Sequence, residues 1–360
     1  MDGAALVRRV WRSPSAGARL ARVALLLPAA GYRAGVDLRN AAYDWGLLRA
    51  SPLPAPSLGV GNIAVGGVGK TPVAALLAAE LSRRGVRPGI LLRGYAGGDE
   101  AEEHRAKSPG AVVVADPDRR RGAARAVAEG AEALVLDDCL QRRDIRCDVM
   151  LAVVAAETDG DRMWPLPAGP WREGLGALGR CDAVVVTYKA AGPEAAAAVA
   201  HRLAPLTRDG LGMAVGLTIG RLVPLRGGTS LAAEWLHGRP VVALCGIGEP
   251  APFGRQLERL GARVRLEAFG DHHAFTVADV AAVLARAGRD SVVVTTAKDA
   301  IRLRPVWPAT APACLVAELD ASVTDGEEPL ARLLDRFGRA SPQRTNPVAA
   351  VVPPDRRKST

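Results

Sequence analysis

Short apolar runs alternate with alanine-rich segments of helical character over the first two thirds of the chain. Six of these runs are rich in Val and Leu at consecutive positions, so both faces of each predicted strand are apolar. Helical segments such as 122–130 and 193–204 separate them. This alternation predicts a mostly parallel sheet covered by helices. The six runs are 59–62, 87–95, 110–116, 131–138, 147–155 and 181–188.

The pattern changes near residue 210. The next twenty residues have a strand-like pattern interrupted by glycines, and no helical segment lies between them. This pattern predicts a β-hairpin-like connector. A second alternation of strands and helices then predicts a smaller α/β domain. The final stretch is rich in Pro, Arg, Ser and Thr and is predicted to be disordered. The expected divisions are 1–45, 46–210, the connector 211–230, the smaller domain 231–337 and the tail 338–360.

Composition shows where the positive charge is concentrated. Hydrophobic residues make up 49% of the chain and charged residues 24%, so a substantial core can be buried. The net charge is +9, and residues 1–50 carry eight arginines against three aspartates, a net of +5. Over half of the excess positive charge therefore lies in the N-terminal segment.

That N-terminal segment also contains an apolar run, 23–32, bounded by Arg22 and Arg33. Ten residues are too few to span a bilayer. The run continues into further arginines instead of ending at a small-residue cleavage site, unlike a secretory signal. We therefore interpret 1–45 as a basic, apolar segment that lies in a membrane interface, with ordinary packing on the core as the alternative.

The spacing of the cysteines and the low aromatic content argue against a zinc-binding protein and a nucleic-acid-binding protein. The five cysteines are scattered without zinc spacing, as expected for reduced thiols in a cytoplasmic protein. Aromatic residues make up 4% of the chain, which offers no stacking platform for nucleic acid, so no nucleic-acid partner is expected despite the basic charge.

A glycine-rich loop stands between the first strand and a helix. Its glycines allow backbone N–H groups to surround the phosphates of ATP, Lys70 neutralises charge, and the Thr71 hydroxyl can bind Mg²⁺. The full motif has glycine where this chain has Ala64. The predicted fold is therefore a P-loop-type α/β fold, and the predicted nucleotide-binding residues are Gly66, Gly67, Val68, Gly69, Lys70, Thr71 and Pro72.

An acidic pair, Asp137 and Asp138, follows the fourth strand. Acidic residues at this carboxyl edge can organise a metal ion with Thr71. An Asp pair after a strand can also cap a helix. Together with the loop, the pair predicts an ATP·Mg²⁺ site, without identifying what accepts the phosphate.

Further motifs identify a resemblance. "VGNIAVGGVGKTP" is followed in order by "RGY", "GDE", "DDCLQ", "LPAGPWRE", "GDHH" and "TTAKDA". The chain resembles the tetraacyldisaccharide 4′-kinase (lipid A 4′-kinase) family over about residues 20–335. The resemblance implies transfer of the ATP γ-phosphoryl group to the 4′-hydroxyl of a tetraacyl glucosamine disaccharide 1-phosphate. It also implies a peripheral or monotopic enzyme on anionic lipids, at the cytoplasmic face of the bacterial inner membrane.

The resemblance carries over roles to single residues. Asp99 matches the family's proposed base and His272 the histidine paired with it, beside the catalytic Lys70. Because His272 lies in the predicted smaller domain, this pairing implies that both domains form the site. The positions matching the substrate side are Arg119, Gln141, Arg172 and Glu173. Cys139, Arg142 and Ala297 depart from the family's usual glycine, histidine and glutamate.

Two other functions remain open from the sequence. One is a dimeric P-loop ATPase of the partitioning or metallochaperone type, although its usual loop lysine is replaced here by Val65. The other is a membrane-surface nucleotide sensor without turnover.

Overall fold

The computed structural model describes residues 15–94, 99–158, 164–288 and 290–339, together with Val7, Val10, Trp11 and Ser13. Most of the predicted tail, residues 340–360, lies outside these ranges.

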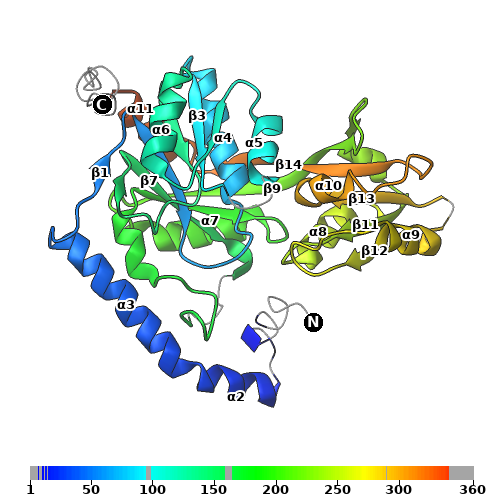
Figure 1. Ribbon diagram of the computed structural model, residues 1–360, viewed down its shortest axis with the longest axis horizontal. Coiled ribbons are helices and arrows are strands. Elements are labelled where there is room, and N and C mark those ends of the chain that lie inside the picture. The colour runs from blue at the N-terminus through cyan, green and yellow to red at the C-terminus, as the bar shows by residue number, and fades with distance from the viewer. Residues whose placement is uncertain are drawn as a thin grey trace, which may run out of the picture.

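Six parallel strands form the centre of the nucleotide-binding half (Figure 1). They lie in the order β4-β3-β5-β2-β7-β8 and confirm the six predicted runs. Consecutive Val, Leu and Ala residues bury both faces of each strand, which is why the apolar runs were continuous. The strands are β2 (Ser57–Asn62), β3 (Pro88–Leu92), β4 (Val112–Ala115), β5 (Ala133–Leu136), β7 (Val149–Ala155) and β8 (Ala183–Tyr188).

Helices cover both faces of this sheet. On one face, α4 (Lys70–Arg83) and α11 (Glu327–Arg339) pack their leucines into one core cluster, which α5 (Asp99–Lys107) also joins. On the other face, α6 (Arg119–Ala128) and α7 (Pro193–Leu203) cover two further clusters. The last helix of the chain thus returns to the first half of the molecule, although its residues follow the smaller unit in sequence.

Two long strands connect the halves. The strand β9 (Leu211–Pro224) continues the parallel sheet beside β8, and β14 (Cys314–Asp325) pairs with it antiparallel from Leu315 opposite Pro224 to Asp325 opposite Ala214. The short β10 (Leu231–Ala232) folds back on β9, as in a hairpin. One sheet therefore runs through both halves, and the boundary between two domains stays an interpretation.

The smaller unit adds three parallel strands to β14. They are β11 (Pro240–Cys245), β12 (Arg263–Ala268) and β13 (Val292–Thr296), in the sheet order β12-β11-β13-β14. The helix α8 (Pro250–Arg259) covers one face, and α9 (Val277–Arg286) and α10 (Ala297–Leu303) cover the other. This order confirms the predicted second alternation of strands and helices.

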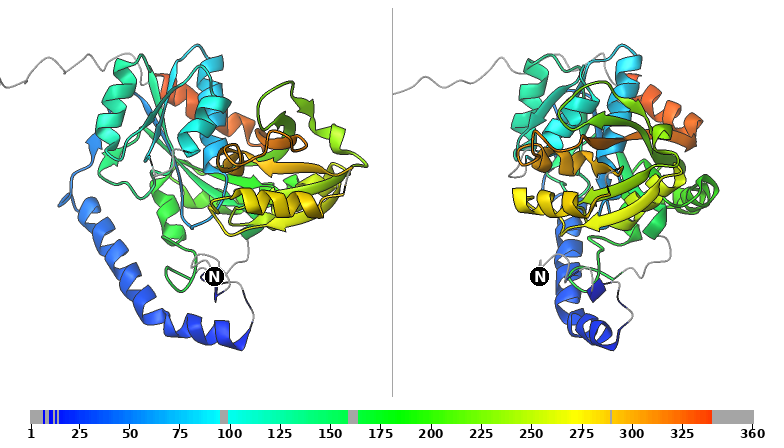
Figure 2. Two further views of the ribbon diagram at one scale, coloured as in Figure 1. Left: turned by 45° about the vertical axis from the view of Figure 1, so that its right-hand side comes forward. Right: turned by 90° about the vertical axis from the view of Figure 1, so that its right-hand side faces the viewer.

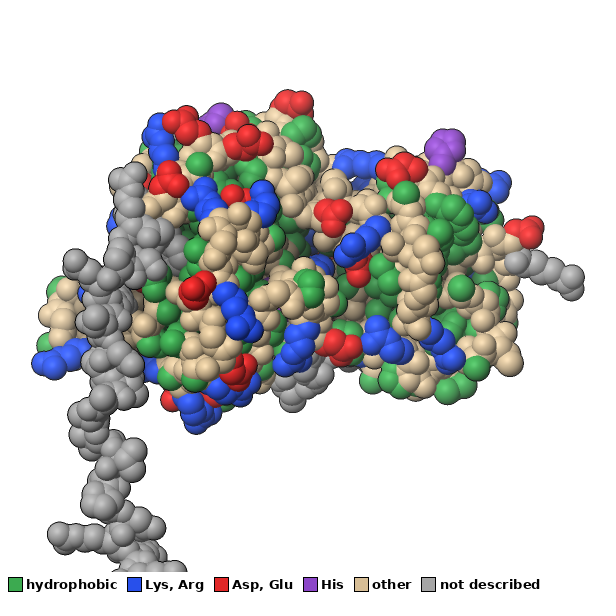
Figure 3. All heavy atoms as spheres, turned by 90° about the horizontal axis from the view of Figure 1, so that it is seen from above, with side chains coloured by type: hydrophobic (Ala, Val, Ile, Leu, Met, Phe, Trp, Pro, Cys, Tyr) green, Lys and Arg blue, Asp and Glu red, His purple; other side chains and the backbone are tan. Residues whose placement is uncertain are grey.

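The two units also touch outside the sheet. Arg304, which follows α10, forms an ion pair of 2.9 Å with Glu102 on α5. The buried Gln256 of α8 donates to the Leu217 carbonyl over 2.7 Å. Acidic and basic side chains lie beside each other over the waist between the units (Figure 3). These contacts place helices of the smaller unit next to the predicted catalytic segments.

An N-terminal arm of two helices, α2 (Ala16–Ala24) and α3 (Leu26–Asp44), extends from the body (Figures 1 and 2). Ser15 caps α2, and its hydroxyl accepts from the Ala18 amide. The arm leaves large apolar side chains in solvent: Leu20 is 71% exposed and Leu27 is 86% exposed. Among the described helices, none has the length and apolar character needed to cross a membrane. The chain then passes to the body through β1 (Ser51–Pro52), which pairs with β6 (Ile145–Arg146).

The continuous sheet predicts that the units unfold together. Leu222 of β9 is fully buried in the core of the smaller unit. Replacing it with Ala should cost about 2–5 kcal/mol. Because β9 also pairs with β8, Leu222→Ala should lower the urea midpoint for β7 as well as β13. Hydrogen exchange of peptides from the two strands measures both midpoints, and a shift confined to β13 would show that the units unfold independently.

Candidate functional site

The phosphate loop connects β2 to α4, as the sequence predicts. Gly69 caps the helix with a φ of 87°, a left-handed conformation that favours glycine, and a Cβ there would overlap Leu217. Pro72 lies in the first helical turn, where its missing N–H costs no helix bond. Gly66 and Gly67 are exposed, so their amides are open to a ligand. The loop and the helix N-terminus together have the geometry that can bind an anion.

A buried carboxylate faces this loop. Asp137 follows β5, and its Oδ2 accepts a hydrogen bond from the Thr71 hydroxyl over 3.1 Å. The Nε2 of His104, on α5, lies 3.4 Å from the same oxygen. Burial raises the pKa of Asp137, but the hydrogen bond and charge of His104 and the Lys70 ammonium together hold it below its ordinary value. The carboxylate therefore stays ionised near neutral pH.

The other oxygen of Asp137 is available for a ligand. Oδ1 is buried and has no hydrogen-bond partner among the described residues. Thr71 and Asp137 offer hydroxyl and carboxylate oxygens, the hard donors that Mg²⁺ prefers. In the described part of the chain, no group of three or more His, Cys, Asp or Glu side chains is arranged around a metal. The donor set fits a Mg²⁺ ion that takes its remaining ligands from nucleotide phosphates and water.

The second acidic residue has a different role in the geometry. Asp138 has a φ of 54°, a left-handed conformation uncommon outside glycine. Its Oδ1 lies 3.6 Å from the Lys70 ammonium and accepts from Arg172 over 3.0 Å. The carboxylates of the pair thus separate, Asp137 toward Thr71 and Asp138 toward the two cations.

Backbone pairing explains why Arg172 and Glu173 reach the site. The Val65 amide donates to the Pro170 carbonyl over 2.7 Å, and the Arg172 amide donates to the Ile63 carbonyl over 2.8 Å. The "LPAGPWRE" segment therefore runs beside the exit of β2, although about a hundred residues separate the two in sequence.

Hydrogen bonds then continue to the arm. Arg172 donates to the Gln141 side-chain carbonyl over 3.2 Å, and the Gln141 amide donates to Glu173 over 3.2 Å. Glu173 is buried and accepts from Asn40 on α3 over 2.9 Å and from Arg180 over 2.7 Å. A cavity of about 250 Å³ between α3 and residues 173–180 borders this cluster. Three of the four predicted substrate-side residues thus form one network with Asp138.

Arg119 lies behind the acidic pair and not on the surface of the site. Its side chain is 2% exposed, and Nη2 donates to the Asp137 backbone carbonyl over 2.7 Å. Burial lowers the pKa of this guanidinium. In this position Arg119 supports the backbone of Asp137, and its buried Nε and Nη1 have no hydrogen-bond partner among the described residues.

The predicted catalytic pair lies at the boundary between the units. Asp99 is the first residue of α5, and its side chain lies outside the described residues. His272 is exposed with a φ of 56°, and its amide donates to the Gly246 carbonyl over 3.0 Å. Arg302 lies 3.2 Å from His272 Nδ1 and donates to Asp299 over 2.6 Å. Since a guanidinium only donates, Nδ1 accepts and the ring proton resides on Nε2.

Sequence reasoning missed Lys189, which is one of only five lysines in a chain with 47 basic residues. It follows β8, and its ammonium donates to the Gly67 carbonyl of the phosphate loop over 2.6 Å. Burial lowers its pKa. The Lys189 amide donates to the Glu157 carboxylate. The Lys189 carbonyl accepts from the side chains of Gln256 and Arg259 on α8. The residue therefore connects the smaller unit to the loop.

The departures from the family pattern are accommodated locally. Cys139 is fully buried next to Met150, and Gly59 leaves space for both because a Cβ there would contact the two sulfur atoms. Arg142 forms two hydrogen bonds with Asp144, of 2.9 and 2.8 Å. Ala297 begins α10 and packs against the apolar core of the smaller unit.

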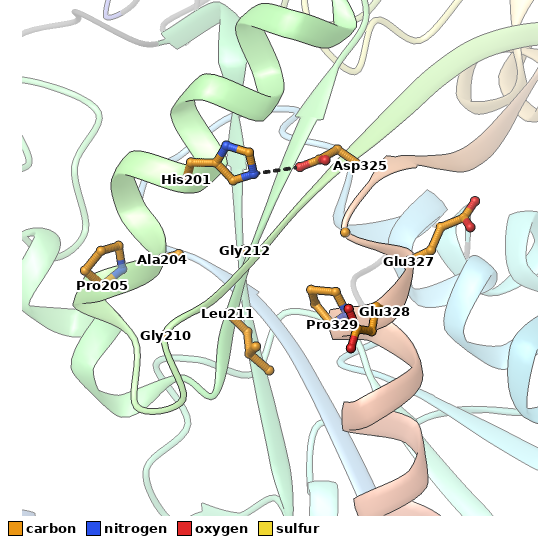
Figure 4. Close-up of a pocket in the computed structure, with 11 residues that line it drawn as sticks. His201, Ala204, Pro205, Gly210, Leu211, Gly212, Asp325, Glu327, Glu328 and Pro329 are labelled. Carbon is orange, nitrogen blue, oxygen red and sulfur yellow. Dashed lines mark ion pairs between the residues drawn. The ribbon is translucent and has the colours of Figure 1, made fainter.

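A separate cavity of about 600 Å³ lies between α7 and the start of α11 (Figure 4). It contains the exposed ion pair of His201 and Asp325, 3.1 Å apart. The residues predicted for the site are not among those that line it. Lys70, Thr71, Asp137, Asp138 and Arg172 lie at the phosphate loop instead.

The tetraacyldisaccharide-1-P 4′-kinase family model matches residues 21–338. The chain belongs to this family. The tetraacyldisaccharide 4′-kinase of Anaeromyxobacter dehalogenans strain 2CP-C is 40% identical over 352 residues, which cover 89% of this chain and 92% of the relative. The Syntrophus aciditrophicus enzyme of the same name is 34% identical, covering 86% of this chain and 92% of its own length.

A solved member of the family has the same fold. The "apo" form of LpxK from Aquifex aeolicus in complex with ATP is 27% identical to this chain, with a TM-score of 0.67. The match covers 88% of this chain and 99% of the Aquifex chain. The P-loop-type α/β fold predicted from the sequence is therefore confirmed as the fold of this kinase family.

The bond from Lys189 to the loop leads to a prediction. Lys189→Met should weaken binding of a fluorescent ATP analogue by about tenfold or more, because a hydrogen bond with one charged partner contributes about 1.5 kcal/mol or more. Titration of the analogue, followed by fluorescence, measures the change. Arg83→Met, at the exposed far end of α4, is the control. Unchanged affinity in Lys189→Met would mean that the loop keeps its binding conformation without this contact.

Proposed function

We propose that this protein is an ATP-dependent kinase that transfers the γ-phosphoryl group to the 4′-hydroxyl of a tetraacyl glucosamine disaccharide 1-phosphate, in lipid A biosynthesis. Membership of the 4′-kinase family over nearly the whole chain is the observation that carries this proposal. The intact pairing of Thr71 with Asp137 beside the phosphate loop supports it. A partitioning or metallochaperone-type ATPase is not favoured, since the named relatives are kinases and the matches cover 92% of each of them.

The loop side of the site binds the nucleotide. Loop amides and the N-terminus of α4 face the phosphates of ATP, and Lys70 places its ammonium against the transferred group. Thr71 and Asp137 would hold Mg²⁺, with Asp138 close to it, and the ion would neutralise charge on the phosphates. Lys70 and Arg172 both contact Asp138, so the site keeps two cations near the phosphoryl group as its charge redistributes.

The acceptor hydroxyl must lose a proton as it attacks phosphorus. In this proposal Asp99 accepts that proton, the 4′-oxygen forms the new bond to phosphorus, and ADP leaves. His272 belongs to the smaller unit and presents its ring N–H at Nε2, where it can donate to a carboxylate. Two contacts of α10 support an Asp99–His272 pair: Arg304, which follows α10, binds Glu102 of the helix that begins at Asp99, and Arg302 of α10 contacts His272.

The substrate side faces the arm. Gln141, Arg172 and Glu173 form the network that reaches Asn40 on α3, so the acceptor would bind between the phosphate loop and the helices of the arm. Hydroxyl and amide groups of a sugar suit such a mixed set of amide, guanidinium and carboxylate partners. Arg172 remains the candidate for contact with a substrate anion, whereas Arg119 acts through Asp137.

The arm would bind the membrane surface that holds the substrate. Exposed leucines on α2 and α3 can enter the interface, while arginines attract anionic head groups at about 1 kcal/mol each. Leu20, Val23, Leu27 and Leu38 are each more than half exposed. We propose peripheral or monotopic binding at the cytoplasmic face of the bacterial inner membrane, where ATP is available.

The kinase proposal is tested with ATP labelled in its γ-phosphate. In detergent with Mg²⁺ and tetraacyl glucosamine disaccharide 1-phosphate, the protein should yield a lipid with a labelled 4′-phosphate, and Lys70→Ala should abolish this product. Asp99→Asn should lower turnover by about 10²–10⁴-fold, the usual contribution of a general base, and leave affinity for an ATP analogue nearly unchanged. ATP hydrolysis without a lipid product would favour the ATPase, and nucleotide binding without turnover would favour the sensor.

The membrane proposal is tested by changing the arm alone. Leu20→Glu with Leu27→Glu should reduce association with anionic liposomes at least tenfold, because each buried leucine contributes about 1.5–3 kcal/mol. Leu206→Glu is the matched control, since Leu206 is 43% exposed but lies far along the chain, after α7. Co-sedimentation with vesicles measures binding, and equal binding of all three proteins would contradict an interfacial arm.

A further inference from the structure

We infer that His104 is a positioning residue for the metal site: it holds one oxygen of Asp137 so that the other oxygen remains directed at the cation. The inference rests on the proposed function only in requiring an ATP·Mg²⁺ site at the phosphate loop. It assigns a role to a residue that belongs to none of the motifs above.

The burial of His104 is costly unless the ring has a partner. Its side chain has 0% exposure, and Nδ1 has no hydrogen-bond partner among the described residues. A polar group removed from water loses free energy when it stays unpaired, and an apolar side chain would fill the same space without that loss. Its Nε2 faces Asp137, whose Oδ2 lies 3.4 Å away. The ring is therefore directed at the carboxylate.

Two donors from different helices restrict the carboxylate of Asp137. The Thr71 hydroxyl, on α4, and His104, on α5, both approach Oδ2. One donor would still allow the carboxylate to rotate, whereas two donors on one oxygen define its plane. The buried Oδ1 is then left without a protein partner, in the position of a metal ligand. Hydrogen bonds of this kind orient metal ligands and commonly change metal affinity by about 10–100-fold.

The contact between His104 and Asp137 also affects other parts of the site, because α5 carries further residues that belong to it. Asp99 begins the helix five residues before His104, about 7.5 Å along its axis. Glu102 of the same helix binds Arg304 of the smaller unit. His104 thus ties the helix that carries the proposed base, and that contacts the smaller unit, to the carboxylate at the phosphate loop. A purely structural reading, in which His104 only anchors α5, is the competing outcome of the test.

The experiment compares three variants of the full-length protein. His104→Leu removes the N–H, His104→Gln keeps an N–H near the position of Nε2, and Arg105→Ala changes the exposed neighbour on the same helix as a control. Mn²⁺ replaces Mg²⁺, and its binding with a non-hydrolysable ATP analogue is measured by electron paramagnetic resonance. His104→Leu should weaken Mn²⁺ binding about tenfold or more, while His104→Gln should stay within about threefold of the wild type. Arg105→Ala should bind as the wild type does.

Each other result overturns a specific part of the inference. Wild-type Mn²⁺ affinity in His104→Leu would show that Asp137 needs no second donor. Equal weakening in the Leu and Gln variants, with circular dichroism unchanged, would show that the shape of the ring anchors α5 and that its N–H does not matter. A wild-type protein that bound neither Mn²⁺ nor the analogue would refute the nucleotide site itself. A wild-type protein that bound both but phosphorylated no lipid would refute only the proposed acceptor.

Discussion

The carboxylate of Asp137 must stay ionised in the protein interior, and much of the site is arranged around this constraint. Burial opposes the charge, so hydrogen bonds and cations from several elements have to compensate it. Thr71 comes from the helix after the phosphate loop, His104 from α5, and Arg119 supports the backbone from α6. Three helices on two faces of the sheet therefore converge on the end of one strand. The position at the carboxyl edge of a parallel sheet makes this convergence possible.

The strands and the phosphate loop could be predicted because their signals are local. Consecutive apolar residues in β5 or β8 bury both faces wherever the strand lies, and the glycines before Lys70 suit only a backbone with unusual freedom. The antiparallel pairing of β9 with β14 could not be predicted, since its partners are about a hundred residues apart and no turn joins them. For the same reason the sequence did not show that one sheet is continuous through both predicted units.

The residues of the candidate site fall into the same two groups: some lie in local sequence motifs, and others reach the site only through the fold. The motifs located Thr71, Asp137, Asp138, Arg172 and Glu173, and the structure brings all five together. The family resemblance placed Arg119 on the substrate side, and the structure shows it buried behind the acidic pair. The local sequence identified neither His104 nor Lys189, because nothing in "EEHRAK" or "VTYKAA" distinguishes a residue at the site from one at the surface; the rarity of lysine was the one signal for Lys189. Such residues are identified only when the chain has brought them to the loop.

A continuous set of contacts relates the smaller unit and the arm to the same loop. On one side, α8 holds the backbone of Lys189, whose ammonium binds the Gly67 carbonyl. On the other side, Asn40 of α3 holds Glu173, which reaches Lys70 through Gln141, Arg172 and Asp138. A shift of α3 relative to the body would first break short polar contacts, which depend steeply on distance, before it disturbed any apolar core. Binding of the arm to a membrane would therefore affect the contacts of Glu173 and Arg172, on the proposed acceptor side of the site. A movement of the smaller unit would instead affect the contact of Lys189 with the phosphate loop, on the proposed nucleotide side.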